Sequence, residues 1–198
     1  MKIFFAKFFS FLFHPVIFFL IMPYIVVYKH TNNNFSALKW AFFSSIFIFI
    51  ALILLILGRI KGVFSDFDIS KREERFKFYF LVFLLAFIYF VIALFFKGVF
   101  FPLSIIVFGL IFGLIIFDVI NNYLKASVHV GVICAYVTTI TIVYGFIGFL
   151  FSFWLMPLVF WSRLELKKHT FQEGMAGGFL GAIITIITFL IGKYFLMK

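Results

Sequence analysis

Residues 162–173 combine side chains that can do phosphoryl-transfer chemistry. The segment reads SRLELKKHTFQE and contains Ser162, Arg163, His169 and Glu173. His169 and Glu173 are four residues apart, so they share one face if the next helix begins nearby. A carboxylate bonded to one ring nitrogen fixes the imidazole tautomer and makes the other nitrogen more basic, which can turn it into a nucleophile. The planar, forked donors of Arg163 match phosphate oxygens.

A second polar segment, residues 125–129, offers another imidazole and an anion-favouring position. It reads KASVH, and Ser127 is a plausible N-cap for the apolar run that follows. A helix N-terminus presents backbone amides and a hydroxyl to an anion. His129 can supply an acid or a base there, although a histidine at the mouth of an apolar helix can also be a simple interfacial residue.

The third polar segment, residues 65–75, is the most charged stretch of the chain and reads SDFDISKREER. It can be a solvated loop with ion pairs along a helix surface. It can also clamp a phosphate, because arginine donors are arranged to meet two oxygens at once. The candidate cations are Lys71, Arg72 and Arg75.

Long runs without charged residues must position these segments. The chain has 198 residues, 66% of them hydrophobic, and a mean hydropathy of +1.24, which indicates an apolar solvent. The runs are 8–28, 40–58, 78–96, 98–117, 126–162 and 174–192. Five of them have 19 to 21 residues, the length of one membrane-spanning helix. We therefore expect an all-α, polytopic transmembrane bundle of six to seven helices, two of them short, in a single domain over residues 1–198.

The order of crossings predicts where the polar segments lie. The run 8–28 is read as one retained helix, and a turn at Lys97-Gly98 joins the third and fourth runs. The run 126–162 has 37 residues, too many for one helix, and Gly145 and Gly148 near its middle predict a hairpin. Counting crossings then brings all three polar segments to the same membrane face.

The order and spacing of these residues resemble the type 2 phosphatidic acid phosphatase (PAP2) family. The third motif of that family is Ser-Arg, five residues, His, and an acid four residues later. The segment 162–173 matches it, with Glu where the family usually has Asp. The second motif, Pro-Ser-Gly-His, is matched by Ser127 and His129, while Ala126 and Val128 replace Pro and Gly.

The first motif of the family, which is Lys, six intervening residues and then Arg-Pro, is less complete. Arg75 matches the Arg, but Asp68 occupies the Lys position and Phe76 replaces Pro. Three residues are candidates for the missing cation: Lys71, Arg72 and Lys125. The resemblance covers residues 60–185.

The resemblance implies a mechanism without a metal or other cofactor. His169 attacks phosphorus and forms a phosphohistidine, Glu173 orients it, and His129 protonates the leaving group and then activates water. Arginines can neutralise the developing charge. The implied phosphate-binding residues are Arg75, Arg72, Lys71, Ser127, Ser162, Arg163 and Lys125. The implied substrate is a lipid phosphate, such as phosphatidate, phosphatidylglycerol phosphate or a polyprenyl diphosphate.

Two other functions fit parts of the sequence. Asp66 and Asp68 can hold Mg²⁺ in a prenyl-transferring membrane enzyme, although acids outside 66–74 are few: Asp118, Glu165 and Glu173. A non-catalytic lipid-binding membrane protein is the other alternative, because Val128 adds a side chain where the motif's glycine lets backbone approach phosphate.

The charge of the chain predicts its surroundings. The net charge of +10 comes from cations in the breaks between apolar runs, so we expect anionic headgroups and a lipid bilayer as partners and no nucleic acid. A bacterial cytoplasmic membrane is the expected location. Twelve of the 17 Lys and Arg residues fall on the motif side, which favours a cytoplasmic site.

Overall fold

Eight α-helices and no strands make up the part of the chain that the structure, a computed structural model, describes, which is residues 1–95 and 101–196. They are α1 (Lys2–Leu12), α2 (Pro15–Thr31), α3 (Asn34–Ile60), α4 (Arg72–Leu94), α5 (Phe101–Asn121), α6 (Val128–Ser152), α7 (Leu155–Glu165) and α8 (Phe171–Leu196). Among the described residues, six stretches are long and apolar enough to cross a membrane: α1 with α2, then α3, α4, α5, α6 and α8. The expected all-α transmembrane bundle is confirmed, and the chain is a multi-pass integral membrane protein.

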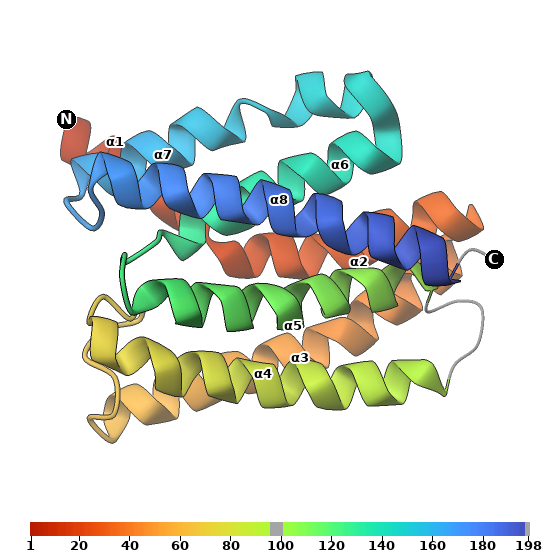
Figure 1. Ribbon diagram of the computed structural model, residues 1–198, viewed down its shortest axis with the longest axis horizontal. Coiled ribbons are helices and arrows are strands. Elements are labelled where there is room, and N and C mark those ends of the chain that lie inside the picture. The colour runs from red at the N-terminus through yellow and green to blue at the C-terminus, as the bar shows by residue number, and fades with distance from the viewer. Residues whose placement is uncertain (96–100, 197–198) are drawn as a thin grey trace.

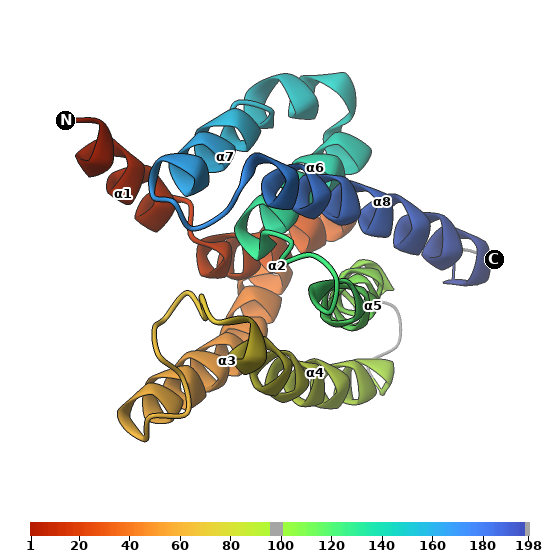
Figure 2. The same ribbon diagram turned by 60° about the vertical axis from the view of Figure 1, so that its left-hand side comes forward.

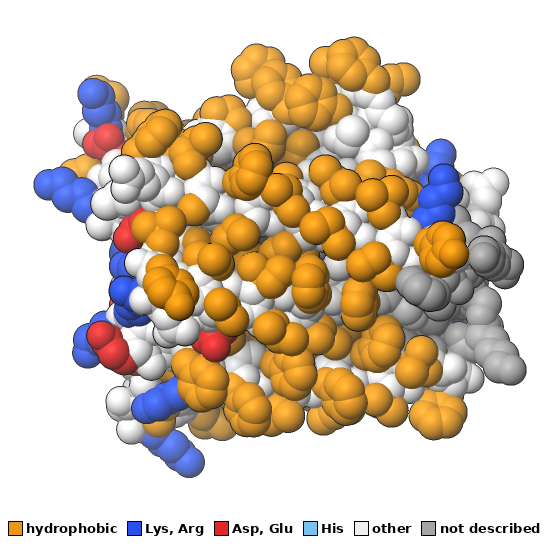
Figure 3. Space-filling view, in the orientation of Figure 1, with side chains coloured by type: hydrophobic (Ala, Val, Ile, Leu, Met, Phe, Trp, Pro, Cys, Tyr) orange, Lys and Arg blue, Asp and Glu red, His pale blue; other side chains and the backbone are white. Residues whose placement is uncertain are grey.

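The surface of the bundle explains why the chain is helical throughout these stretches. Apolar side chains cover most of the face shown in Figure 3, while charged side chains gather mainly at its left-hand end. Hydrocarbon offers no hydrogen bonds to an exposed backbone, so each spanning segment must satisfy its own amides and carbonyls within a helix. The connections between α3 and α4, α5 and α6, and α7 and α8 all lie at the charged end (Figure 1).

The hairpin expected within 126–162 forms at Gly145. This residue has φ 69° and ψ −156°, a conformation that glycine adopts far more readily than other residues. A side chain at Gly148 would crowd the carbonyl of Ile140 at 2.7 Å, so its absence lets the two limbs approach. The two limbs of the hairpin differ in regularity. The first limb is one continuous helix up to Gly145, whereas the returning limb is divided between the end of α6, which stops at Ser152, and α7, which begins at Leu155.

The N-terminal run is divided, which differs from the single helix expected over 8–28. Pro15 lacks an amide proton and fixes its own φ, so it begins α2 and ends α1. His14 is the N-cap of α2, and its Nδ1 accepts the amide of Val16 at 3.4 Å. The short α1 packs beside α7 (Figure 2). The turn expected at Lys97 and Gly98 lies outside the described residues.

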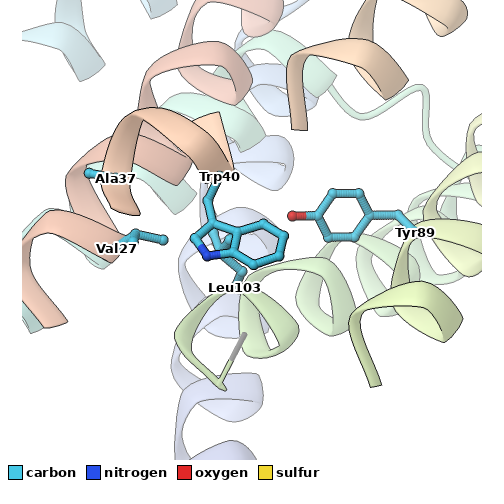
Figure 4. Close-up of a cluster of buried hydrophobic side chains, with 5 residues drawn as sticks. All are labelled: Val27, Ala37, Trp40, Tyr89 and Leu103. Carbon is cyan, nitrogen blue, oxygen red and sulfur yellow. The ribbon is translucent and has the colours of Figure 1, made fainter. Parts of the chain in front are cut away.

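A buried aromatic cluster joins the middle helices on the side away from α7. Tyr89 of α4 points toward Trp40 of α3, and the cluster is completed by Val27, Ala37 and Leu103 (Figure 4). The Tyr89 hydroxyl is hydrogen-bonded to Ser44 Oγ at 2.9 Å, which satisfies a buried polar group that would otherwise be costly.

Glycines bring α6 and α8 into backbone contact. A side chain at Gly177 would overlap the backbone of Ser127, and one at Gly181 would overlap the carbonyl of Gly131. Small residues permit such close approach of membrane helices. The amide of Ser127 also donates to the carbonyl of Glu173 at 2.9 Å, so the start of α6 is held against the start of α8.

Candidate active site

The three polar segments meet at the charged end of the bundle, as the order of crossings predicts. Arg75 joins the first segment to the second, because its Nη1 donates to the carbonyl of Ala126 at 3.0 Å. Arg163 joins the third to the first, with Nη2 lying 3.2 Å from Asp68 Oδ2. The hydrogen bond from the amide of Ser127 to the carbonyl of Glu173 joins the second segment to the third. Residues about a hundred positions apart are thus direct neighbours.

His169 is held by a carboxylate that also caps a helix. Its Nδ1 lies 3.1 Å from Glu173 Oε2, and the amide of Thr170 donates to the same oxygen at 3.1 Å. The amide of Glu173 in turn donates to Thr170 Oγ1 at 3.3 Å. This reciprocal pair is a capping box at the start of α8. The Thr-x-x-Glu spacing at residues 170–173 is the sequence signal for this capping box. The prediction that His169 and Glu173 share a face rested on their four-residue separation alone.

The surroundings of His169 keep its ring neutral. Burial lowers its pKa to about 4, and the guanidinium groups of Arg163 and Arg75 act in the same direction. A neutral ring that donates from Nδ1 to Glu173 carries its lone pair on Nε2. His169 therefore has the tautomer and the protonation state of a nitrogen nucleophile at neutral pH.

The imidazole of His129 lies against that of His14, a residue that was not among the predicted site residues. The rings of His129 and His14 are perpendicular, with centroids 5.0 Å apart. His129 is only 7% exposed, and its Nε2 is buried without a hydrogen-bond partner, 3.9 Å from Asp68 Oδ1. In the sequence, His14 is visible only as the residue before Pro15, which is a helix-start signal.

Asp68 is the counter-ion at the centre of the site. Its Oδ2 faces Arg163 at 3.2 Å and Lys168 Nζ at 3.6 Å. Lys168 also donates to Ser70 Oγ at 3.0 Å, and Arg163 donates from Nη1 to Ser10 Oγ at 2.9 Å. A carboxylate thus pairs with cations that otherwise suit a phosphate. Lys168 and Ser10 were not among the predicted site residues.

Arg72 and Arg75 mainly hold the backbone of the neighbouring segments. Arg75 is buried, and besides Ala126 it donates to the carbonyl of Ile69 at 3.3 Å and to Asn121 Oδ1 at 3.4 Å. Arg72 donates from Nε to the carbonyl of Asn121, whose side-chain amide donates back to the Arg72 carbonyl at 3.2 Å. Arg72 Nη2 is buried and lacks a hydrogen-bond partner.

The two candidate lysines differ in their placement. Lys71 points outward with its side chain 64% exposed, and its Nζ lies 3.6 Å from Glu74, so it is not part of this cluster. Lys125 reaches inward, and its Nζ donates to the carbonyl of Lys168 at 3.4 Å. Burial and the neighbouring Arg75 lower the pKa of Lys125.

The two candidate serines also differ. Ser127 is the N-cap residue of α6, but its hydroxyl does not cap the helix, and Oγ is fully buried with no hydrogen-bond partner. Ser162 Oγ donates to the carbonyl of Val159 at 2.8 Å, within α7. Of the two hydroxyls, that of Ser127 has the unused hydrogen-bonding capacity.

The two aspartates of the first segment do not form a shared metal clamp. Asp66 Oδ1 accepts the amides of Asp68 and Ser70 and the hydroxyl of Ser70, at 2.8 to 3.3 Å. Such bonds from an aspartate to residues two and four positions later stabilise a tight turn. Asp66 thus shapes the loop, while the side chain of Asp68 pairs with Arg163 and Lys168.

Comparisons with protein-family models, with curated proteins and with solved structures found no match. The site is defined by its own geometry: buried imidazoles, a carboxylate on one of them, and buried cations, at one end of a membrane-spanning bundle. Such a set can supply a nucleophile, a proton carrier and charge stabilisation for an anion.

Proposed function

We propose that this chain is a membrane lipid-phosphate phosphatase of the PAP2 type, which hydrolyses a lipid phosphomonoester or diphosphate through a phosphohistidine. The observation that carries the proposal is the His169–Glu173 pair, fixed by a capping box and set beside Arg163. A neutral imidazole with its lone pair on Nε2 is prepared for attack on an electrophilic phosphorus.

The first step forms the phosphoenzyme. His169 Nε2 bonds to phosphorus as the bond from phosphorus to the leaving oxygen breaks. His129 in its protonated form gives a proton to that oxygen, and the carboxylate of Glu173 stabilises the positive imidazole. Arg163 stabilises charge on the phosphoryl oxygens, with the Ser127 hydroxyl as a further donor.

The second step regenerates the enzyme. His129, now neutral, takes a proton from water as the water oxygen attacks phosphorus and the bond from phosphorus to Nε2 of His169 breaks. Inorganic phosphate leaves, and His129 is protonated again for the next turnover. Protein groups carry every transferred proton and stabilise the charge in both steps, so the proposed reaction needs no metal.

An apolar groove supports a lipid as the substrate. An open groove of about 340 Å³ lies between α2, α6 and the chain that follows Gly145, and it is lined by Ile25, Tyr136 and Ile140 among others. Tyr136 is two helical turns from His129 along α6, about 10 Å deeper into the bundle. A headgroup at the charged end can therefore extend its tail into apolar surroundings.

The decisive test is phosphate release from a panel of lipid phosphates by the purified protein, with EDTA present. The panel contains phosphatidate, phosphatidylglycerol phosphate and a polyprenyl diphosphate. We expect turnover of at least one of them, and His169→Ala abolishes it. His30→Ala is the matched control, because His30 is in the last turn of α2, at the opposite end of that helix from His14. Unchanged turnover in His169→Ala contradicts the proposal.

The pairing of Asp68 with Arg163 and Lys168 favours one alternative, a protein that binds phospholipid without hydrolysing it. A carboxylate that already neutralises these cations makes the site a weaker clamp for a transferring phosphoryl group. The double variant His129→Ala/His169→Ala separates the two functions. Normal cellular function of that variant favours lipid binding alone.

We further propose that the protein resides in a bacterial cytoplasmic membrane with this site on the cytoplasmic side. The excess of Lys and Arg at the charged end supports that orientation. A cysteine in place of Lys61, in a Cys134→Ser background, reports the side. We expect a membrane-impermeant thiol reagent to label it in inverted vesicles and not in intact cells.

A further inference from the structure

Three metal-ligating side chains from three different elements converge beside the proposed catalytic pair. They are His14 at the start of α2, Asp68 in the loop between α3 and α4, and His129 in the first turn of α6. One ligand atom from each lies within 4.8 Å of the other two. Because the three residues are 54 and 61 positions apart along the chain, only the packing of the bundle brings them together.

The side chain of His129 indicates that the cluster is a binding site. Its Nε2 is buried, lies 3.9 Å from Asp68 Oδ1, and has no hydrogen-bond partner. A buried polar atom without a hydrogen-bond partner destabilises the folded state. A bound ion would remove that destabilisation by accepting the lone pair of the ring.

The two oxygens of Asp68 face different groups. Oδ2 pairs with Arg163 and Lys168, whereas Oδ1 is turned toward the imidazole of His129. An ion bound through Oδ1 would share this carboxylate with both cations. The carboxylate can bridge the ion and its positive neighbours, which reduces the repulsion between them.

The donor set selects for a particular kind of ion. Two imidazoles and one carboxylate suit Zn²⁺ and related first-row dications, whereas Mg²⁺ prefers oxygen ligands and octahedral geometry. Three protein ligands with a fourth position open are typical of non-structural zinc sites. Two ligand atoms on one tetrahedral zinc ion lie about 3.4 Å apart. Ligand atoms up to 4.8 Å apart must therefore approach by up to about 1.4 Å, which two side chains can share.

Binding carries one identifiable cost at His14. Its Nδ1 accepts the amide of Val16 at 3.4 Å, so use of either ring nitrogen by a metal ion ends this bond. The bond is long, and a long N–H···N contact is weak. The pre-placed oxygen of Asp68 and the unpaired nitrogen of His129 offset its loss.

We propose that His14, Asp68 and His129 form a zinc-type metal site that holds His129 out of proton transfer. A metal ion on Nε2 occupies the lone pair that the second chemical step uses to accept a proton. Zinc is therefore an inhibitor of hydrolysis and not its cofactor. The binding part of this inference stands independently, and the inhibition part rests on the proposed phosphatase function.

The binding test needs no lipid and no activity. Purified full-length protein in detergent is titrated with Zn²⁺ against a chromophoric chelator, and Co²⁺ absorption reports the ligand geometry. We expect one tight zinc ion per chain, and His14→Ala and Asp68→Asn each weaken binding at least about 100-fold, since even outer-shell partners contribute 10–100-fold. His30→Ala is the control and keeps the affinity. Equal zinc affinity in wild type and His14→Ala, with both proteins folded by circular dichroism, overturns the site.

The inhibition test compares phosphate release with and without Zn²⁺ within each variant. Zinc lowers the wild-type rate, and EDTA restores it, whereas in His14→Ala the ratio of the two rates stays near one. Zinc that binds tightly while leaving the wild-type rate unchanged overturns the inhibitory role. If no lipid phosphate is hydrolysed at all, the proposed function fails, while the titration still decides the metal site.

Discussion

Nδ1 of His169 and Oε2 of Glu173 lie 3.1 Å apart, and the same oxygen accepts the amide of Thr170. One carboxylate thus performs two tasks, capping α8 and fixing the tautomer of the proposed nucleophile. Glutamate at the third position of a helix has the reach for a capping box. In the proposed PAP2-type site, this accounts for Glu173 where that motif usually has Asp.

Loss of the Glu173 charge should slow hydrolysis without unfolding the protein. Glutamine still fits the capping box, but it no longer stabilises the positive imidazole that forms during attack. We expect Glu173→Gln to lower kcat by roughly 100-fold, the scale of acid–base and orientation effects. The rate of phosphate release at saturating lipid phosphate measures this kcat. Glu165→Gln, near the end of α7, is the control, and equal losses in both variants would argue against a specific role for Glu173.

The pH dependence should reflect the lowered pKa of His169. Burial and the two arginines bring that pKa to about 4, compared with an ordinary value near 6.5. The ring is neutral and nucleophilic above its pKa, so phosphohistidine formation should decline only as the pH falls toward 4. Glu173 raises this pKa, and Glu173→Gln should shift the decline to lower pH. The rate of phosphoenzyme formation, measured by rapid quench, tests this. A decline centred near 6.5 would contradict it.

The contact between α6 and α8 should tolerate no added side chain. At Gly181, a methyl group would overlap the carbonyl of Gly131. Both partners at that contact are backbone, so the helices must separate. We expect Gly181→Ala to lower the free energy of unfolding by about 1–3 kcal/mol, the usual range for overpacking. Thermal unfolding in detergent, followed by tryptophan fluorescence, provides the measurement.

Gly113→Ala is the matched control for that experiment. A methyl group there would meet Ile184 Cγ2 at 3.9 Å, which is ordinary van der Waals contact. Its stability should stay close to that of the wild type. If both alanine variants unfold at the same temperature, the close packing of α6 and α8 does not hold the site together.

Removal of the Asp68 charge should strengthen anion binding. Asp68→Asn releases Arg163 and Lys168 from their shared carboxylate, so both can pair with a bound anion. We expect orthovanadate to bind about tenfold more tightly, which corresponds to about 1.4 kcal/mol, less than one full charge-assisted hydrogen bond. Inhibition of phosphate release by vanadate, or calorimetry on the purified protein, measures the change. Asp118→Asn on α5 serves as the control, and weaker binding in Asp68→Asn would show that the carboxylate supports the anion site.

The membrane fold was readable from the sequence because the bilayer is a uniform solvent. A spanning helix needs about 20 apolar residues wherever it lies, so uninterrupted runs predicted the spans without knowledge of contacts. Helix breaks at particular residues were harder to read. The break at Gly145 was expected from glycine in an overlong run, but the one at Pro15 was missed, because run length took precedence over the strong helix-start signal of a proline.

The pair His169 and Glu173 was accessible for a similar reason, since its contact is local in sequence. The meeting of the three polar segments was also predicted, because counting membrane crossings determines which loops share a face. Which side chains meet within that face was not predicted. Lys71 was proposed as a site cation and points outward, while Lys168, only one residue from His169, reaches Asp68.

The sequence by itself therefore determined the solvent, an all-helical bundle of six to seven spans, and one local pair of residues. Only the tertiary structure decided that Asp68 is the counter-ion of Arg163, and that His14 lies against His129. These contacts join residues 95 and 115 positions apart, and they depend on how the helices rotate and pack. Helix rotation in a bilayer is set by close packing, here through Gly177 and Gly181, because lipid solvates every apolar face equally well.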